Sequence, residues 1–253
     1  MSLQVKNLCV AYKTVTVLQN ISASLPAGQI TAVIGCNGAG KSTMLKAMAG
    51  LIPMSGQMHL GGVPLTQGGV HRDIAYMPQE TSATSSLTVL EVILLGRLHS
   101  LGMSVPEQMI TQAYQALDAF GLSSLQARTL DAISGGQRQL VYLAQAMFRN
   151  PRVLLLDEPT AALDLRHQLL VLETLRGFVD KTGGIVAVAM HDLTLAAQFS
   201  DQVIGLKDGQ VLACGAPCDV MVPDHLRDMY RIEAEVHRTA MGHLQVTPLR
   251  AMN

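Results

Sequence analysis

Nine residues from Gly35 to Thr43, Gly-Cys-Asn-Gly-Ala-Gly-Lys-Ser-Thr, combine three glycines with a lysine and two hydroxyl side chains. They meet the pattern G-x-x-x-x-G-K-[ST], whose glycines let successive backbone N–H groups point inward around a phosphate. An apolar run from 30 to 34 precedes the pattern and a helix-forming run from 41 to 49 follows it. The order of strand, loop and helix therefore predicts a phosphate-binding loop, with the positive end of the helix dipole facing the phosphates.

The side chains of this loop have distinct predicted roles. The Lys41 ammonium would reach the β- and γ-phosphates, the Ser42 hydroxyl would bind Mg²⁺, and Thr43 would contact the α-phosphate. A glycine-rich turn with a solvated lysine is the structural alternative, and the flanking strand and helix argue against it. The residues expected around the phosphates are Gly35, Asn37, Gly38, Ala39, Gly40, Lys41, Ser42 and Thr43.

Two adjacent carboxylates, Asp157 and Glu158, follow the apolar run from 153 to 156. The carboxyl end of a buried strand is where α/β sheets bind ligands. Asp157 would therefore hold Mg²⁺, directly or through water, and Glu158 would orient or deprotonate an attacking water molecule. Two adjacent acids are usually a solvated turn, but the fully apolar strand ahead of them argues for a site.

Gln79 and His191 also follow short apolar runs, 74–77 and 185–190. Gln79 is placed to reach a bound metal or water, and His191 to hydrogen-bond a γ-phosphate. Taken alone, each has an ordinary explanation, as a surface glutamine and as a histidine satisfied within the structure. The predicted catalytic residues are Lys41, Gln79, Glu158 and His191, and the predicted Mg²⁺ ligands are Ser42, Gln79 and Asp157.

A second glycine-rich stretch, Ser134-Gly135-Gly136-Gln137, opens a predicted helix that runs to about Phe148. Ser134 is a suitable N-cap, and the two glycines leave the first N–H groups of the helix open to an anion. A capped helix without a ligand is the alternative. Tyr12, ahead of the phosphate loop, is a candidate for stacking on adenine, although a tyrosine after a strand more often simply packs.

The elements that must position these residues indicate an α/β fold. Alternating apolar and polar residues predict an antiparallel layer from Leu3 to Val10 and from Val17 to Leu25, and apolar runs predict a mostly parallel core sheet. Beyond Gln79 the pattern becomes helical, and Thr88 with Glu91 predicts a capped helix that continues through Arg97. We expect one domain over 1–253, with a core of 1–81 and 151–253 and a helical subdomain of 82–150.

Further elements are predicted from turn residues and periodicity. They are a hairpin and loop from 55 to 69, a polar loop from Thr81 to Ser86, a helix from Pro106 to Phe120, a helix from Arg166 to Phe178 with Leu169, Leu172 and Leu175 on one face, a hairpin from 203 to 214 turning at Asp208-Gly209, short helices from 217 to 231, and a weak strand pair at 234–237 and 244–247.

Composition narrows the class of protein. Of 253 residues, 49% are apolar and 15% are charged, which excludes a disordered chain, and the net charge of −1 gives no basic excess for a nucleic-acid partner. The N-terminal residues do not form a signal-peptide pattern, and no apolar run approaches the about 18 residues of a membrane span. The four cysteines, which we interpret as reduced thiols and not as a metal site, are Cys9, Cys36, Cys214 and Cys218.

Taken together, these motifs resemble the ATP-binding-cassette ATPases, because they occur in that family's order over nearly the whole chain. The resemblance implies a P-loop NTPase cassette that uses ATP and Mg²⁺. It makes Tyr12 the adenine-stacking aromatic residue, Gln79 the lid glutamine that links nucleotide to a membrane partner, and Asp164 a dimer-contact residue. The other correspondences are residues 35–43 with the Walker A loop, Ser134 to Gln137 with the signature motif, Asp157 and Glu158 with the Walker B pair, and His191 with the switch histidine.

The resemblance also explains why one chain has two phosphate-binding ends. In this family two cassettes meet head to tail, so Ser134 and Gly136 of one subunit close over the γ-phosphate held by Lys41 of the other. Cys36 stands where proline is common in the family, and Ile133 where leucine is common. Neither departure removes a catalytic group, but Cys36 places a thiol beside the phosphates and leaves sensitivity to alkylation open.

Stretches such as Leu95-Gly96-Arg97 and Leu163-Asp164-Leu165-Arg166-His167-Gln168 look like the uptake ATPases for ferric siderophores, haem and cobalamin. That likeness implies an ATPase that powers import of a metal chelate. It would act as a homodimer at the cytoplasmic face of the membrane, under two separate permease subunits and, indirectly, an external substrate-binding protein. About 60 residues follow His191, too few for the regulatory domain of sugar-type importers. The cargo is held by the other subunits, so the cassette does not identify it.

Two other functions are weighed against import. A cassette that serves an exporter is the nearer alternative. A soluble cassette ATPase acting on nucleic acid or ribosomes is the second, but chromosome and repair members carry a long coiled coil between the Walker A loop and the signature, and translation factors fuse two cassettes. The about 90 residues between Lys41 and Ser134 have no sustained heptads, and the chain has one cassette.

Overall fold

The computed structural model describes residues 1–253 except 67–68, 70, 80–84, 99–103, 162 and 253. The strands are β1 (Ser2–Tyr12), β2 (Val15–Pro26), β3 (Gln29–Ile34), β4 (Ser55–Leu60), β5 (Val63–Pro64), β6 (Ile74–Met77), β7 (Val153–Asp157), β8 (Ile185–Ala189), β9 (Gln202–Lys207), β10 (Gln210–Gly215), β11 (Ile232–Arg238) and β12 (Leu244–Ala251). The helices are α1 (Lys41–Met48), α2 (Val89–Leu95), α3 (Glu107–Asp118), η2 (Ser123–Leu125), η3 (Leu130–Ala132), α4 (Gly135–Phe148), α5 (Leu165–Thr182), α6 (Leu193–Phe199), α7 (Pro217–Val220) and α8 (Pro223–Tyr230).

A six-stranded sheet in the order β10-β9-β3-β8-β7-β6 forms the centre of the molecule. Strands β9, β3, β8, β7 and β6 are parallel to their neighbours, and β10 pairs antiparallel with β9. Side chains of β7 alternate between two hydrophobic cores, with Leu154 and Leu156 in one and Val153 and Leu155 in the other. Because both faces of the sheet are covered, its central strands β7 and β8 are almost entirely apolar. The parallel pairing of these strands confirms the predicted mostly parallel core.

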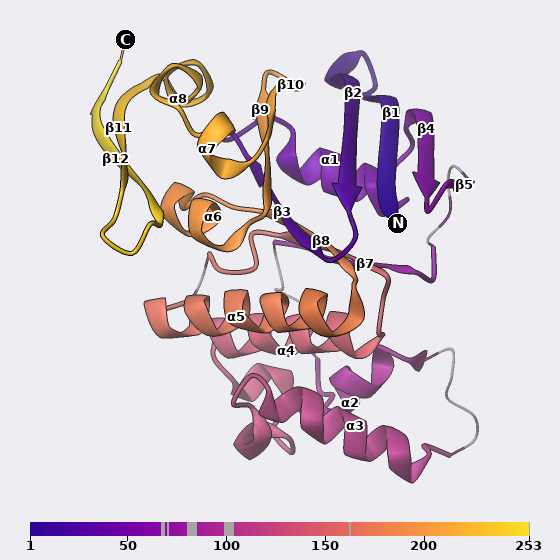
Figure 1. Ribbon diagram of the computed structural model, residues 1–253. Coiled ribbons are helices and arrows are strands. Elements are labelled where there is room, and N and C mark those ends of the chain that lie inside the picture. The colour runs from indigo at the N-terminus through magenta and orange to yellow at the C-terminus, as the bar shows by residue number, and fades with distance from the viewer. Residues whose placement is uncertain (67–68, 70, 80–84, 99–103, 162, 253) are drawn as a thin grey trace.

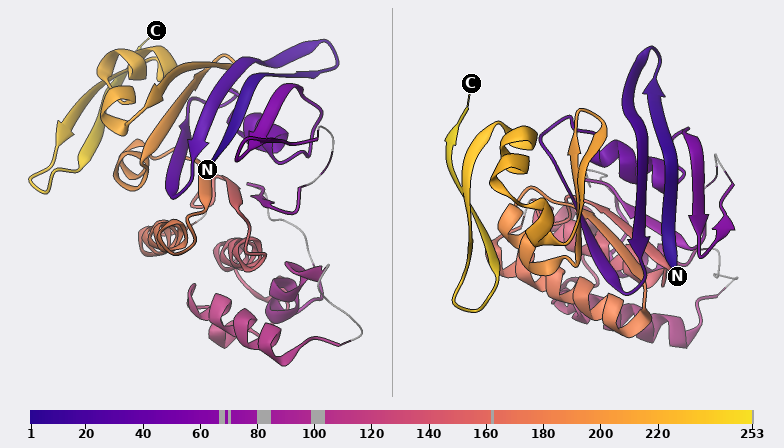
Figure 2. Two further views of the ribbon diagram at one scale, coloured as in Figure 1. Left: turned by 45° about the vertical axis from the view of Figure 1, so that its right-hand side comes forward. Right: turned by 45° about the horizontal axis from the view of Figure 1, so that its top comes forward.

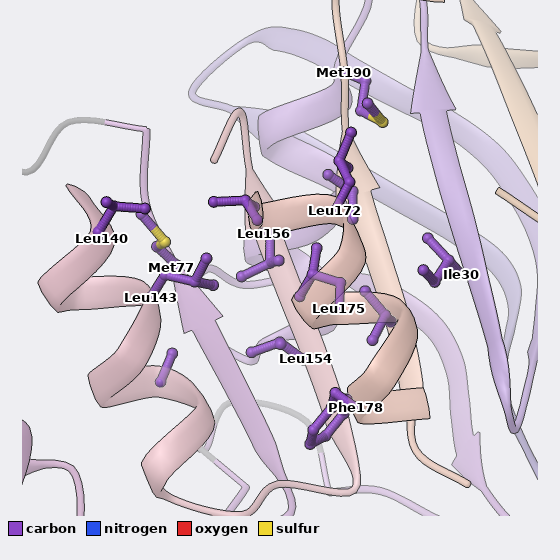
Figure 3. Close-up of a cluster of buried hydrophobic side chains, with 14 of the residues drawn as sticks. Ile30, Met77, Leu140, Leu143, Leu154, Leu156, Leu172, Leu175, Phe178 and Met190 are labelled. Carbon is purple, nitrogen blue, oxygen red and sulfur yellow. The ribbon is translucent and has the colours of Figure 1, made fainter. Parts of the chain in front are cut away.

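Different layers cover the two faces of this sheet (Figure 1 and Figure 2). On one face, α1 lies between the central sheet and a four-stranded antiparallel sheet in the order β2-β1-β4-β5. On the other face, α4 and α5 lie side by side, and Figure 3 shows their leucines together with those of β7. The predicted antiparallel N-terminal layer is therefore confirmed.

The helices α2, α3 and α4 pack on one another beyond this second face. Thr88 caps α2 and Ser134 caps α4, and in each case the residue three positions on, Glu91 or Gln137, completes a capping box. Such caps satisfy the free N–H groups at a helix start and stabilise a helix by about 0.5–2 kcal/mol. Part of the predicted loop from Thr81 to Ser86, including the proposed division of the chain at 81–82, lies outside the described residues.

Some predicted boundaries were wrong. Helix α2 ends at Leu95, and Arg97 lies beyond it, where its Nε donates to the Phe148 carbonyl at 2.5 Å. Helix α3 ends at Asp118, before the predicted Phe120. Leu169 is 40% exposed although Leu172 and Leu175 are buried, because a spacing of three residues drifts around a helix of 3.6 residues per turn. Helix α6 was not predicted.

The C-terminal elements agree with the predicted pattern. Strands β9 and β10 form a hairpin around Asp208 and Gly209, both with positive φ, as a two-residue turn requires. Helices α7 and α8 follow, and the predicted weak strand pair is the longer hairpin β11–β12. This hairpin packs on α6, where the Thr194 hydroxyl lies 3.3 Å from both the N–H and the carbonyl oxygen of Val246.

Candidate functional site

The parallel strands bring four separate motifs to one edge of the central sheet. The phosphate loop follows β3, His191 follows β8 by two residues, Asp157 ends β7, and Gln79 follows β6. These four strands are consecutive neighbours in the order β3-β8-β7-β6. Because parallel strands end at the same edge, residues more than a hundred positions apart in sequence meet there.

The phosphate loop is held tightly against the sheet. Gly35 has a φ of +148°, and a Cβ at this position would lie 2.4 Å from the carbonyl oxygen of Leu206 in β9. Gly40, with a φ of +102°, is the N-cap of α1 and supplies no side-chain cap. The loop therefore requires glycine at both positions, and it leaves the first N–H groups of α1 free of a side-chain cap, as anion binding needs.

Lys41 is a buried cation within this loop. Its side chain is folded back so that Nζ donates to the carbonyl oxygens of Gly35 at 2.8 Å and Cys36 at 3.2 Å. Burial lowers the pKa of Lys41 below its ordinary 10.5, and the charges of Glu158, Cys36 and Asp157 partly oppose that shift. A phosphate group beside Nζ would add the anion that this buried ammonium lacks.

Asp157 receives hydrogen bonds on both carboxylate oxygens. The Ser42 hydroxyl donates to Oδ1 at 2.9 Å, and the Tyr76 hydroxyl donates to Oδ2 at 3.2 Å. Burial and the Asp157 charge raise the pKa of Tyr76, which keeps its hydroxyl protonated as a donor. In the described part of the chain no three His, Cys, Asp or Glu side chains gather as a metal cluster. A single carboxylate with a hydroxyl nevertheless fits Mg²⁺, which keeps several waters and commonly adds substrate phosphates.

The Glu158 carboxylate is held between two of the predicted catalytic residues. Gln79 Nε2 donates to its Oε2 at 2.6 Å, and His191 Nε2 lies 2.5 Å from its Oε1. The Glu158 backbone has a φ of +53°, a strained region for a residue other than glycine, and its carbonyl oxygen accepts a bond from the buried Gln139 side chain at 3.0 Å. Glu158 is thus fixed at both backbone and side chain.

These groups line a cavity of about 600 Å³. Its walls are formed by Val17, phosphate-loop residues 37–38 and 40–43, Gln79, Glu158 and His191. Gly35, Ala39 and Asp157 lie behind this surface; Ala39 and Asp157 are buried side chains. Tyr12 is 47% exposed at the end of β1, paired with Val15, and is not one of the lining residues.

The signature residues line a different cavity, of about 430 Å³. Its walls are formed by Ser134, Gly136, Gln137, Leu140, Leu163, Asp164 and His167. Gly135 is the first residue of α4, and the Gln137 side chain is used in the capping box. Asp164 caps α5, and hydrogen bonds from the His167 backbone and side chain lower its pKa. The two predicted phosphate-binding ends therefore do not share a cavity within one chain.

Three residues that touch the site were not predicted from the sequence. Tyr76 and Gln139 carry a weak signal, since each is a polar group on an otherwise apolar strand or helix face. Tyr230, whose hydroxyl accepts the Gly35 N–H at 2.7 Å, carries none, because 195 positions separate the two residues.

Comparison with known proteins identifies the family. Residues 18–161 match the ABC transporter family. Over 245 residues the chain is 37% identical to the iron(3+)-hydroxamate import ATP-binding protein FhuC of Bacillus subtilis, covering 93% of this chain and 90% of that relative. It is also 37% identical over 262 residues to the hemin import ATP-binding protein HmuV of Bordetella pertussis, covering 97% and 99% of the two chains.

A solved structure supports the same assignment. A chain of a solved ABC transporter described as of the metal-chelate type, in an inward-facing conformation, is 27% identical, with a TM-score of 0.84 over 98% of each chain. No helix in the described part of the molecule is both long and apolar enough to span a membrane. The family predicted from the order of the motifs is confirmed, and the chain belongs to the ABC transporter family as one of its ATP-binding cassettes.

Proposed function

We propose that this chain is the ATP-hydrolysing subunit of an importer that takes up a metal chelate, most specifically a ferric siderophore, haem or cobalamin. The observation that carries the ATPase part is the Glu158 carboxylate, fixed by Gln79 and His191 on the wall of the cavity that also contains Lys41. The kinship to import ATP-binding proteins for iron-hydroxamate and hemin supports the cargo class.

Binding and orientation of ATP fall to the phosphate loop. Its backbone N–H groups and the start of α1 surround the triphosphate, and Lys41 turns from the Gly35 and Cys36 carbonyls to the β- and γ-phosphates. Mg²⁺, held by Ser42 and Asp157, would neutralise phosphate charge when bound. Tyr76 keeps the Asp157 carboxylate oriented toward Ser42.

Glu158 orients the attacking water and accepts its proton. A carboxylate held by two hydrogen bonds loses little freedom when water binds, which favours a productive geometry. His191 lines the same cavity as Lys41, and on ATP binding its imidazole would exchange the bond to Glu158 for one to the γ-phosphate. Gln79 bonds to the other carboxylate oxygen of Glu158, so a movement of this carboxylate would also move Gln79 and link nucleotide binding to a membrane partner.

The separate signature cavity is the basis for a head-to-tail homodimer. Ser134 and Gly136 would close over the γ-phosphate bound by the other subunit, and Asp164 would lie at the contact. Two separate permease subunits and, indirectly, an external binding protein complete the transporter, which places this chain peripherally at the cytoplasmic face of the membrane.

The test has two stages. Purified protein should release phosphate from ATP only when Mg²⁺ is present, and Lys41→Ala should abolish that release. Cells that lack this chain should then lose uptake of labelled ferric siderophore, haem or cobalamin, with recovery by the parent chain and not by Lys41→Ala. Normal uptake of all three compounds without the chain would contradict the cargo class, and absence of ATP hydrolysis at high protein concentration would contradict the enzyme assignment.

A further inference from the structure

A tyrosine from the C-terminal end of the chain touches the first glycine of the phosphate loop. Tyr230 is the last residue of α8, and its hydroxyl oxygen accepts the Gly35 N–H at 2.7 Å. Burial raises the pKa of Tyr230, so the hydroxyl stays neutral. This contact joins the last turn of α8 directly to the nucleotide site.

Close packing on β9 brings the tyrosine to this position. Gly205 in β9 has no side chain, and a Cβ there would lie 2.7 Å from Met229 Sδ in α8. The next residue of the same strand, Leu206, has its carbonyl oxygen so close to Gly35 that no Cβ fits there either. Helix α8 and the phosphate loop therefore both pack closely on β9. The Tyr230 side chain reaches from α8 to the Gly35 N–H of the loop.

Gly35 is consequently held from two sides. Its carbonyl oxygen accepts the Lys41 ammonium at 2.8 Å, and its N–H donates to Tyr230. Both hydrogen bonds fix the peptide planes at the point where β3 turns into the loop. The next N–H groups in the chain are those expected to surround the phosphates, so a rotation at Gly35 would move them together.

The C-terminal hairpin keeps α8 in place. Helix α8 ends at Tyr230, and the next residue, Arg231, has a φ of +53° and leads into β11. The Met252 N–H donates to the Arg231 carbonyl at 2.7 Å. Val246 of β12 bonds to Thr194 of α6 through both backbone groups. The hairpin that follows Tyr230 is thus joined both to the end of α8 and to α6.

We propose that Tyr230 is a positioning residue for the phosphate loop, and that its hydroxyl holds the Gly35 peptide in the orientation that binds the triphosphate. The proposal rests on the proposed function, since it assigns a role within ATP binding. Because the Tyr230 hydroxyl bonds to the loop backbone, we expect it to contribute equally to binding of the ground state and the transition state, and so to affect KM more than kcat.

The test compares Tyr230→Phe with the parent protein. Removal of the hydroxyl should raise the KM and the dissociation constant for ATP by about 3- to 10-fold, the effect expected of one lost buried hydrogen bond, and leave kcat within about twofold. Tyr142→Phe is the matched control, because Tyr142 is a half-buried tyrosine of α4 whose hydroxyl makes no hydrogen bond within the described residues. It should leave KM unchanged. An unchanged KM in Tyr230→Phe would overturn the proposal.

Two further measurements separate positioning from a general loss of stability. Thr194→Val weakens the contact between α6 and the hairpin without touching the Tyr230 hydroxyl; it should lower the melting temperature and leave KM unchanged. In the parent protein without nucleotide, amide hydrogen exchange should be slower at Gly35 than at Gly38, whose surroundings are open. Rapid exchange at Gly35, or an equal rise in KM in Thr194→Val, would contradict the role of the hydroxyl. A parent protein that does not bind ATP would instead refute the proposed function.

Discussion

The phosphate-loop cavity and the signature cavity differ in how their polar groups are held. In the first, Lys41, Asp157 and Glu158 are buried; Lys41 bonds to carbonyls of its own loop, whereas Asp157 and Glu158 bond to residues from distant parts of the chain. In the second, Ser134 and Asp164 are exposed and bond to residues three positions away, within their own helix starts. One site is assembled by the whole fold, whereas the other consists of two local helix caps.

This difference indicates how much of each site one chain supplies. In the phosphate-loop cavity the polar groups are already buried and hydrogen-bonded, so one chain forms this site and only the ligand is missing. An exposed helix N-terminus by itself stabilises a bound anion only weakly. It binds an anion strongly only when a second surface excludes water from the site. We therefore expect substitutions in the first cavity to affect a single subunit, and substitutions in the second to act only when two subunits meet.

The largest effect should come from Glu158→Gln. A positioned proton acceptor contributes about 10²- to 10⁴-fold to a rate, so hydrolysis should fall by that factor while ATP binding is kept or strengthened. ATP would then hold two subunits closed, and size-exclusion chromatography with Mg²⁺ and ATP should show a dimer that ADP does not support. Glu173→Gln, on the exposed face of α5, is the control and should behave as the parent. Hydrolysis at the parent rate would exclude Glu158 as the base and make His191 the next residue to test.

Lys41→Ala should weaken ATP binding by about 10- to 150-fold, the cost of losing a charge-assisted hydrogen bond of about 1.5–3 kcal/mol. Titration calorimetry measures the change directly in a single subunit. Lys46→Ala is the matched control, because Lys46 lies in the last turn of the same helix, away from the loop. Equal affinities for the parent and Lys41→Ala would remove Lys41 from its assigned role.

Ser134→Arg should leave ATP binding to a monomer nearly intact but stop closure and turnover, since its effect requires a second subunit. Mixing tests the arrangement. When Ser134→Arg and Lys41→Ala subunits are combined, one composite site carries both changes and the other carries neither. Partial recovery of hydrolysis supports the head-to-tail arrangement if one intact site suffices. Closure of a Ser134→Arg homodimer on ATP would contradict it.

The smallest expected effect is a pH dependence of ATP binding in the first cavity. Burial lowers the pKa of Lys41 in the free protein, and the triphosphate restores it by supplying negative charge. Binding should therefore take up a proton and weaken, by at most about tenfold per pH unit, as pH rises through the lowered pKa toward 10.5. Calorimetry in buffers of different ionisation enthalpy measures the uptake. Lys41→Ala should lack it, and equal uptake in that variant would place the titrating group elsewhere.

Local signals in the sequence determined most of the elements. Glycines with lysine and serine at a known spacing define the phosphate loop, apolar runs closing on polar residues define β6, β7 and β8, and capping residues such as Thr88 and Ser134 mark helix starts. Each of these signals depends on the conformation of a few consecutive residues, which a sequence shows directly. The order of the motifs then identified the family, as the comparisons confirmed.

Only the tertiary structure decided which groups meet. It brought three pairs into hydrogen-bonding contact: Tyr76 with the Asp157 carboxylate, Gln139 with the Glu158 carbonyl, and Tyr230 with the Gly35 N–H. It also placed Tyr12 outside the lining of the cavity. These outcomes depend on strand order, on register and on the close approach of backbones at glycines, and contacts across 19 to 195 positions leave no periodic pattern in the chain. Side-chain periodicity shows which face of an element is buried, but not which partner it meets there.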